Sequence, residues 1–426
     1  MWILYQAAVA LALLLAGPWL LLSRGRHYLA SLPRRLGRYA EAPAAGTAEE
    51  PGPLWVHAVS VGEVGVAATL ARALPGDLPL LVTTITPTGQ ERARSLLGDR
   101  AAVAYLPFDL GFAVHRFFER FRPRALVLAE GDLWPLLLRG AKDRGLPVTV
   151  VNGRVSDQSF RRMRRLRALL GPLLSRVDRF AVQSAEDAHR LAALGVPATR
   201  LTVTGNLKFE TAPPDPQPAL EGALREVAGG RPILVAGSTM AGEEEEVLAA
   251  FAPAGGGEGA LLLLAPRHPE RCLEVEGLAA RRGFRLRRRS RLPEAGGRGD
   301  ADVLLLDTVG ELAALYRLAA GAFVGGTLVP TGGHNPLEPA RFAVPVVAGP
   351  AMENFRDIAR AFDAAGAWAR VEDAAGLARV WREWLGSPET ARELGRRGAA
   401  LLEAHRGALR QTLELLAPAI AAARAA

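Results

Sequence analysis

The sequence predicts an α/β fold with two parallel, doubly wound sheets. From residue 54 onward, short apolar runs alternate with amphipathic stretches, which is typical of strands connected by helices. The alternation stops at a proline- and glycine-rich stretch near residue 211 and then starts again. The chain has 426 residues, too many for one ordinary core, and 49% of them are hydrophobic, which excludes a disordered chain.

The N-terminal segment is apolar and is followed by basic residues. Residues 2–22, WILYQAAVALALLLAGPWLLL, carry no charge and would span roughly 30 Å as a helix, enough to cross a bilayer. Pro18 weakens this helix. The positive-inside rule would place the rest of the chain in the cytoplasm. The basic side chains that follow are Arg24, Arg26, His27, Arg34, Arg35 and Arg38.

We therefore expect an anchor helix over residues 1–23 that holds the protein at the inner membrane. A cleaved signal peptide fits poorly, because its positive charge would precede the apolar run. The remaining alternative is a hydrophobic helix that lies in the membrane interface or on the domain itself.

The first domain is expected over residues 24–210. Helical patterns, for instance Val64–Leu74 and Ala185–Leu194, separate its strands. The predicted strands are Leu54–Ala58, Leu80–Thr84, Ala102–Tyr105, Ala125–Ala129, Val148–Asn152, Arg179–Val182 and Leu201–Thr204.

A linker is expected over residues 211–231, and a second domain with C-terminal helices over residues 232–426. The charged stretch 286–300 reads as an exposed loop. The predicted strands of this half are Ile233–Ala236, Ala260–Leu264, Val303–Leu306, Ala322–Val324 and Val344–Val347. The picture is of two similar domains with a cleft between them.

Composition excludes several classes of protein. The single cysteine, Cys272, cannot form an intramolecular disulfide, and no cysteine or histidine spacing indicates zinc. The net charge of +8 suits phosphate groups, anionic lipid or nucleic acid without choosing among them. The chain lacks the Walker and GxGxxG patterns of an ATPase or a dehydrogenase, and it also lacks HEXXH and GxSxG.

Polar residues follow three predicted strands of the first domain. Parallel sheets bind ligands at the carboxyl ends of their strands, so these residues are candidates for a site. The alternative for Glu63 is a carboxylate that merely complements the dipole of the next helix. The candidates are Ser60, Gly62 and Glu63 in HAVSVGEVG, Glu130 and Asp132 in AEGDLWP, and Asn152 and Arg154 in VNGRVS.

Two strand ends of the second domain suit an anionic ligand. Ser238 and Thr239 in AGSTMAGEEEE lead into a helix whose backbone N–H groups could hold a phosphate, although an ordinary cap fits as well. Arg267 and His268 in APRHPER follow the next strand, where a solvated loop is the alternative.

The stretch GGTLVPTGGHNPLEPA, residues 325–340, combines four glycines with a helix start. Glycines allow backbone amides to approach a ligand closely, and Asn335 is a candidate helix cap. Glu338 would face the cleft and accept hydrogen bonds from ribose hydroxyls, while amides near Gly333 would meet phosphate. The alternative is a turn that only needs positive φ angles.

Several segments, in matching order over almost the whole chain, resemble the 3-deoxy-D-manno-octulosonic acid (Kdo) transferases. They include WVHAVSVGEV, TTITPTGQERA, YLPFDL, VTGNLKFE, PRHPER, GELAALY and FVGGTLVPTGGHNPLEPA. The resemblance implies a GT-B glycosyltransferase fold, a CMP-Kdo donor and a lipid IVA-type acceptor. It also implies inversion at the anomeric carbon with no metal or cofactor.

The resemblance assigns roles to particular residues. It implies that Glu63 is the general base and that the residues after the first-domain strands contact the acceptor. The implied donor contacts are Arg267, His268, Gly332, Gly333, Asn335 and Glu338. Lys208 matches a family lysine near the interdomain cleft, and we expect it on the donor side together with Ser238 and Thr239, the phosphate candidates. Two positions depart from the family pattern: Met240 stands where many relatives have histidine, and Asp132 where many have glutamate.

Two alternatives stay open. One is another membrane-associated GT-B transferase with a different nucleotide sugar. The other is a non-catalytic basic protein that binds phosphate-rich lipid or nucleic acid; the strand-end carboxylates and the lack of a nucleic-acid-binding motif argue against nucleic acid. The arginine-rich stretch 160–174, FRRMRRLRALLGPLL, is predicted to be a helix facing the membrane or the acceptor's phosphates.

Overall fold

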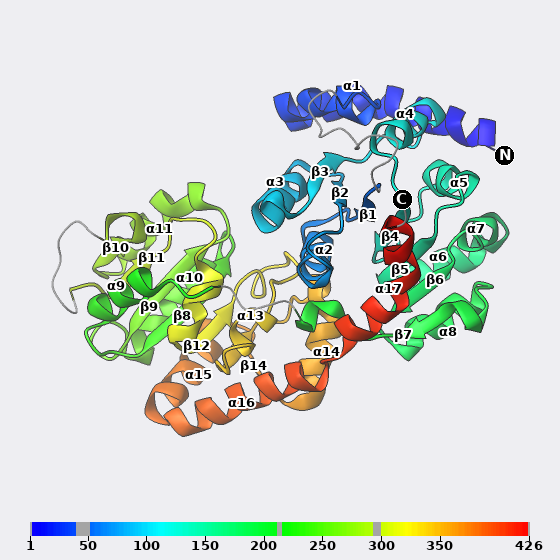
Figure 1. Ribbon diagram of the computed structural model, residues 1–426. Helices are drawn as coiled ribbons and strands as arrows, with labels where there is room; N and C mark the ends of the chain where they lie inside the picture. Colours follow the sequence, from blue (N-terminus) through cyan, green and yellow to red (C-terminus); the bar gives the residue numbers. More distant parts are fainter. Residues whose placement is uncertain (1, 40–51, 211–214, 293–299, 425–426) are drawn as a thin grey trace. The chain divides into compact units, whose positions relative to one another are not determined.

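The computed structural model describes residues 2–39, 52–210, 215–292 and 300–424 (Figure 1). Contacts between residues divide the chain into two compact units. Unit 1 comprises Met1–Thr211 and His405–Ala426, and unit 2 comprises Ala212–Ala404. Parts of the predicted linker and of the predicted loop, residues 211–214 and 293–299, lie outside the described residues.

Unit 1 is built on a parallel seven-stranded sheet with the strand order β3-β2-β1-β4-β5-β6-β7. The strands are β1 (Leu54–His57), β2 (Leu80–Thr84), β3 (Ala102–Tyr105), β4 (Ala125–Ala129), β5 (Val148–Gly153), β6 (Arg179–Val182) and β7 (Leu201–Val203). All seven predicted strands are therefore confirmed, to within one residue at their ends. Each is a short apolar run, as expected for a sheet that helices cover on both faces.

Helices connect these strands and complete unit 1. They are α1 (Trp2–Arg35), α2 (Val61–Ala73), α3 (Pro87–Leu97), α4 (Gly111–Phe121), α5 (Pro135–Asp143), α6 (Asp157–Arg165), α7 (Arg167–Leu174), α8 (Ala185–Ala193) and α17 (Ala408–Arg424). The predicted helix over 160–174 is in fact two helices, α6 and α7, which meet at Leu166. Within α7, Pro172 has no backbone N–H to donate.

Unit 2 repeats the architecture with the strand order β10-β11-β9-β8-β12-β13-β14. Its strands are β8 (Ile233–Thr239), β9 (Leu261–Pro266), β10 (Leu286–Arg288), β11 (Val303–Leu305), β12 (Ala319–Val324), β13 (Val346–Ala348) and β14 (Ala369–Arg370). Its helices are α9 (Pro218–Ala228), α10 (Glu243–Phe251), α11 (Cys272–Arg281), α12 (Leu312–Leu315), α13 (Leu337–Ala340), α14 (Arg356–Ala365), α15 (Ala374–Gly386) and α16 (Pro388–Ala404).

The predicted loop over 286–300 contains an edge strand, β10. Its arginines are paired with carboxylates: Arg287 lies 3.1 Å from Asp300, and Arg288 lies 2.6 Å from Glu276. A charged strand is tolerated at a sheet edge, where it also discourages pairing with another chain.

The domain boundaries differ from the predicted ones in two places. Within the predicted linker 211–231, α9 is a helix of unit 2 with proline at its start and Gly229 at its end. The last helix, α17, belongs to unit 1 instead of the second domain, and Ala408, Leu416 and Ala419 lie in the same buried cluster as β1 (Figure 1). Long-range apolar packing, invisible in local sequence, decides this placement.

The membrane anchor expected over residues 1–23 is not confirmed. Among the described residues, no helix has the length and apolarity needed to span a membrane. Both ends of α1 instead contact one short segment of unit 1: Gln6 accepts a hydrogen bond from Gly111 N at 3.0 Å, and the Arg35 carbonyl accepts one from Phe108 N at 2.8 Å. A straight helix would separate these residues by about 44 Å, so α1 is bent.

Candidate active site

The sheet of unit 1 brings the predicted first-domain residues to one edge. β1 pairs with β4, and β4 pairs with β5, all in parallel. Residues that follow these strands therefore emerge at the same edge of the sheet. From β1 the sheet continues to β2 on one side and to β4 on the other, which makes this edge a topological switch point, the usual place for a ligand in such folds.

Glu63 lies in the first turn of α2 and forms a capping box with Ser60. The Ser60 hydroxyl accepts a hydrogen bond from Glu63 N and donates one to Glu63 Oε1 at 2.8 Å. Glu63 Oε2 accepts from Val59 N at 2.8 Å. The S-x-x-E spacing dictates this local geometry. Helix capping, the alternative weighed for Glu63, is therefore real, yet the two oxygens keep further lone pairs for a proton.

The surroundings of Glu63 favour its protonated form. The residue is only 7% exposed, and burial raises the pKa of its carboxyl to about 7. Hydrogen bonds from Val59 and Ser60 lower this pKa, while the negative charges of Glu130 and Asp132 raise it further. A carboxylate with a pKa near neutrality is suited to accept a proton from a hydroxyl group.

Glu130, Asn152 and Lys208 form a connected polar cluster. Lys208 Nζ lies 2.6 Å from Glu130 Oε1, and Asn152 Nδ2 donates to the same oxygen at 3.3 Å. Asn152 Oδ1 accepts from Leu207 N at 2.9 Å, which fixes the short helix η3 (Leu207–Glu210) that carries the lysine. Lys208 was predicted to contact the donor, but it pairs with Glu130, a predicted acceptor contact.

The backbone is strained at this cluster. Glu130 and Asn152 have φ angles of 57° and 54°, in the left-handed region that residues other than glycine seldom adopt. Such strain is characteristic of functional sites, where surrounding contacts hold the residue in place.

The other predicted first-domain residues lie around this cluster. A Cβ added at Gly62 would lie 3.8 Å from Lys208 Nζ, so the glycine leaves room beside the ammonium. Asp132 is exposed in the loop after β4, and Arg154 is half-buried just after β5. Each follows one of the strands that meet at this edge.

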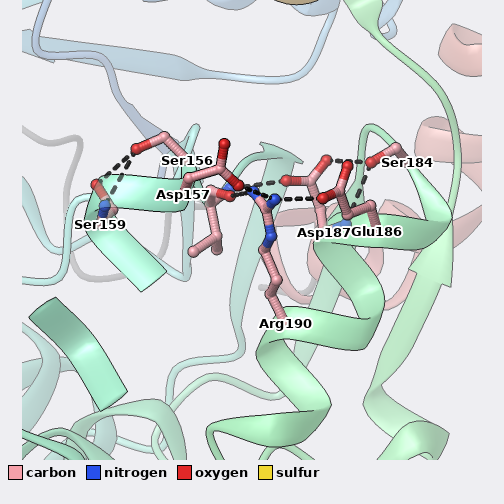
Figure 2. Close-up of polar contacts among 8 residues, drawn as sticks. Ser156, Asp157, Ser159, Ser184, Glu186, Asp187 and Arg190 are labelled. Atoms are coloured by element: carbon pink, nitrogen blue, oxygen red, sulfur yellow. Dashed lines mark hydrogen bonds and ion pairs between the residues drawn. The ribbon is translucent and has the colours of Figure 1, made fainter. Parts of the chain in front are cut away.

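Beyond Arg154, a polar network fixes the start of the basic helix α6 (Figure 2). Arg190 reaches from α8 to the carboxylates of Asp157 and Glu186 and to the Val155 carbonyl. Asp187 accepts hydrogen bonds from Val155 N at 2.8 Å and from Ser184 Oγ at 2.5 Å. The network holds α6 against α8. Five exposed arginines follow, namely Arg161, Arg162, Arg164, Arg165 and Arg167.

In unit 2, the switch point lies between β8 and β12. Ser238, at the end of β8, has a φ angle of 58°, so it repeats the strain seen in unit 1. Thr239 is fully buried, and its hydroxyl donates to Glu244 Oε1 at 3.1 Å. That hydroxyl is therefore already engaged with the protein, whereas Ser238 is partly exposed.

The glycines after β12 serve close packing of the backbone. Gly332 and Gly333 have φ angles of 90° and 75°. A Cβ at Gly333 would lie 2.6 Å from the Met352 sulfur and 2.7 Å from the Ala351 carbonyl oxygen. Gly333 N donates to the Gly326 carbonyl at 2.8 Å, so the expectation that this amide meets phosphate is wrong for this conformation. The positive-φ alternative explains these two positions.

The end of this stretch is a single short helical turn. Asn335 Oδ1 accepts from Leu337 N at 3.2 Å, which closes a turn just before the helix. The N-cap of α13 is Pro336 and not Asn335 as predicted, because the helix begins one residue later than expected. Glu338 lies in α13 and is half-buried. Burial raises the pKa of Tyr316, and the negative charge of Glu338 adds to this increase. Burial lowers the pKa of Arg341, and the charge of Glu338 opposes this decrease. Glu338 thus lies near a phenol and a guanidinium.

Arginine and histidine side chains lie at the end of β9 and in the glycine-rich stretch. Arg267 and His268 are exposed after β9, and Arg267 N donates to the Thr239 carbonyl at 2.9 Å. Burial, together with the charges of Arg267 and His268, lowers the pKa of His334 to about 4, so its imidazole is neutral near pH 7. The three side chains therefore interact electrostatically. His334 was not assigned from the sequence, where its signal was a lone histidine among glycines.

Named proteins from other organisms are similar to this chain in sequence. The family described as 3-deoxy-D-manno-octulosonic-acid transferase (kdotransferase) matches residues 30–211. A 3-deoxy-D-manno-octulosonic acid transferase of Haemophilus influenzae is 37% identical over 94% of this chain and 93% of its own length. One from Bordetella pertussis is also 37% identical, over 90% of each chain.

The chain belongs to the 3-deoxy-D-manno-octulosonic acid transferase family. Its two parallel-sheet α/β units are those of GT-B glycosyltransferases. The solved structure of Anabaena HepE in complex with UDP and glucose has the same fold, with a TM-score of 0.54 and 12% identity over 86% of this chain and 100% of that one. Family and fold thus agree with the resemblance seen in the sequence.

Proposed function

We propose that this glycosyltransferase moves Kdo from CMP-Kdo to a lipid IVA-type acceptor, with inversion at the anomeric carbon. Membership of the Kdo transferase family supports the reaction class. The observation that carries the mechanism is the buried Glu63 carboxyl, with a pKa of about 7, at the switch point of unit 1.

In this proposal, Glu63 is the general base. It takes the proton from the acceptor hydroxyl while that oxygen bonds to the anomeric carbon of Kdo. The bond from this carbon to the CMP phosphate breaks, and CMP leaves with the electron pair. A base with a pKa near the working pH is the most effective proton acceptor for such a step.

Unit 1 would bind the acceptor around the same base. Lys208 offers an ammonium to an acceptor phosphate, and its pairing with Glu130 holds that ammonium in place. Arg154, half-buried at the same edge, offers further hydrogen bonds, whereas the fully buried Asn152 would act by positioning Glu130 and Lys208. Ser60, Gly62 and Asp132 are the remaining candidates: the first two adjoin Glu63 in the chain, and the charge of Asp132 acts on the Glu63 carboxyl.

Unit 2 would bind the donor. Arg267 provides positive charge for the phosphate or the Kdo carboxylate, and His268 and His334 can donate hydrogen bonds from a ring N–H. Glu338 can only accept hydrogen bonds, so it suits the ribose hydroxyls. Asn335 and the partly exposed Ser238 are the remaining candidates with a polar side chain. In this proposal Gly332, Gly333 and Thr239 shape the site through the backbone and buried contacts.

The protein would act at the cytoplasmic face of the inner membrane, where the acyl chains of the acceptor reside. Leu11, Leu14 and Leu15 on α1 are 57%, 72% and 73% exposed, an apolar surface suited to the membrane interface. The exposed arginines of α6 would add attraction to anionic lipid.

The decisive experiment incubates the purified protein with CMP-Kdo and lipid IVA and measures the mass of the lipid product. We expect one or more increments of Kdo, and none with Glu63→Gln. Transfer from another nucleotide sugar, with none from CMP-Kdo, would overturn the proposed donor.

A further inference from the structure

The acidic run Glu243–Glu246 at the start of α10 is split by the fold into residues with different tasks. Glu245 pairs with Arg282 at the surface, and Glu246 accepts a hydrogen bond from Ala374 N. Glu243 and Glu244 are both fully buried. Glu244 has a cation partner, Arg271, at 2.6 Å. From the sequence, the four residues look like ordinary acidic residues of a first helical turn. In the structure, only Glu243 and Glu244 point into the protein.

Every hydrogen bond that the Glu243 carboxylate accepts comes from a backbone N–H group. Oε2 accepts from Met240 N at 2.9 Å and from Gly326 N at 2.5 Å. Oε1 accepts from Thr327 N and Leu328 N, both at 2.8 Å. Across the described ranges, this carboxylate forms no ion pair. Burial raises the pKa of the Glu243 carboxyl, and the four amide donors oppose this by favouring its charged form.

This arrangement resembles the backbone sites that hold ligand anions at such strand ends, but here the protein's own carboxylate fills it. The amides of Gly326, Thr327 and Leu328 are consequently unavailable to a phosphate. Their role is structural, because the Gly326 carbonyl accepts from Gly333 N at 2.8 Å and from the Thr331 hydroxyl at 3.1 Å. The conformation of the glycine-rich stretch thus depends on Gly326.

We propose that Glu243 is a positioning residue for the donor: it ties the segment after Ser238 to residues 326–328 and so presets the stretch that leads to Glu338. The inference rests on the proposed function, in which unit 2 binds the nucleotide-sugar donor. It assigns Glu243 no contact with the substrate. Its effect on the reaction passes through the backbone that it holds.

The test uses Glu243→Gln in the full-length protein. Glutamine keeps the size but replaces one oxygen with an NH2 group, which would face two backbone N–H donors and leave them unsatisfied. Buried unsatisfied donors change an equilibrium by roughly tenfold or more. We expect the Michaelis constant for CMP-Kdo to rise at least about tenfold and that for lipid IVA to stay within about twofold. Amide hydrogen exchange at residues 326–328 should accelerate by a similar factor.

The matched control is Glu245→Gln, the same substitution at an exposed position of the same helix, which should change neither constant. Should Glu243→Gln fail to fold, Glu243→Asp retains the charge on a shorter side chain and should show the same changes at smaller size. Thermal melting identifies which variants are folded.

A folded Glu243→Gln with the normal donor constant and normal exchange at 326–328 would overturn the inference. Equal rises in both Michaelis constants would do the same, because they would indicate general destabilisation. Hydrogen exchange requires no donor. It therefore tests the positioning even if the unaltered protein proves not to use CMP-Kdo, a result that would count against the proposed function alone.

Discussion

Replacing Glu63 with glutamine separates its chemical role from its structural one. Glutamine can reproduce both contacts of the carboxylate: its oxygen can accept from Val59 N, and its NH2 group can donate to the Ser60 hydroxyl. The fold of α2 should therefore persist. What glutamine cannot do is accept a proton at neutral pH. We expect transfer to fall by roughly a hundred- to ten-thousandfold, the usual contribution of a general base.

The magnitude of the pH effect follows from the buried position of Glu63. With a pKa of about 7, roughly one tenth of the Glu63 side chains are ionised at pH 6 and roughly nine tenths at pH 8. The rate constant kcat/KM should thus rise about tenfold between these values. Ser60→Ala removes a hydrogen bond that lowers this pKa, so it should move the profile to higher pH. Asp132→Asn removes a charge that raises it and should move the profile to lower pH.

The raised pKa of Glu63 also makes the stability of the folded protein depend on pH. The folded-state pKa lies above the ordinary value of 4.5, so the folded protein holds a proton that the unfolded chain releases. Stability from this group is therefore fully present below about pH 4.5 and is lost as pH rises to about 7, by up to ~3 kcal/mol. Glu63→Gln should be more stable than the unaltered protein at pH 8.

The assay measures initial rates from pH 5.5 to 8.5 together with thermal melting at both extremes. Near-normal turnover by Glu63→Gln would show that the base lies elsewhere. A flat profile between pH 6 and 8 would show that Glu63 is already ionised, and the assigned desolvation would then be wrong.

Three further outcomes are expected. Glu338→Ala should raise the Michaelis constant for CMP-Kdo about tenfold and leave that for the acceptor unchanged; a selective acceptor defect would contradict the donor assignment. Reversing charge at Arg161 and Arg165 should weaken binding to phosphatidylglycerol vesicles at low salt by roughly tenfold or more, at about 1 kcal/mol per basic residue; unchanged binding would mean that α6 is an ordinary solvated helix. Tyr5→Phe removes a 2.8 Å hydrogen bond to Asp109 and should lower stability by about 1 kcal/mol in denaturant titration, whereas no loss would show that the N-terminal part of α1 is not docked.

Local pattern was enough to locate most strands and the main candidate residue. The strands of unit 1 are short apolar runs bounded by turn residues, and burial on both faces of a parallel sheet leaves that signature in the sequence. Glu63 was identifiable because it directly follows the first predicted strand and matches the SVGE motif of the family. Its hydrogen bonds with Ser60 were found only in the structure. The interaction of Arg267, His268 and His334 was only partly foreseen. Arg267 and His268 follow a predicted strand, whereas His334 lies in a distant segment of the chain.

Three predictions that rested on the composition of a segment differ from the structure. The stretch 211–231 is rich in proline and glycine, yet α9 within it starts at Pro218 and ends at Gly229, as the preferences of helix ends predict. The charged stretch after residue 285 contains β10, because its arginines find carboxylate partners that are remote in the sequence. The apolar N-terminal segment suggested an anchor, yet polar groups at both ends of α1 bind to residues 108–111.

By itself, then, the sequence determined those features that depend on near neighbours: two runs of alternating strands and helices, Glu63 just after the first strand, and the short turn at Asn335. Only the tertiary structure decided which unit α17 joins, that Lys208 pairs with Glu130, and that Glu243 fills the amides of residues 326–328. The physical reason is the range of the interactions. Hydrogen bonds within a turn leave a fixed spacing in the chain, whereas a buried carboxylate and amides more than eighty residues away meet only after the sheet has formed.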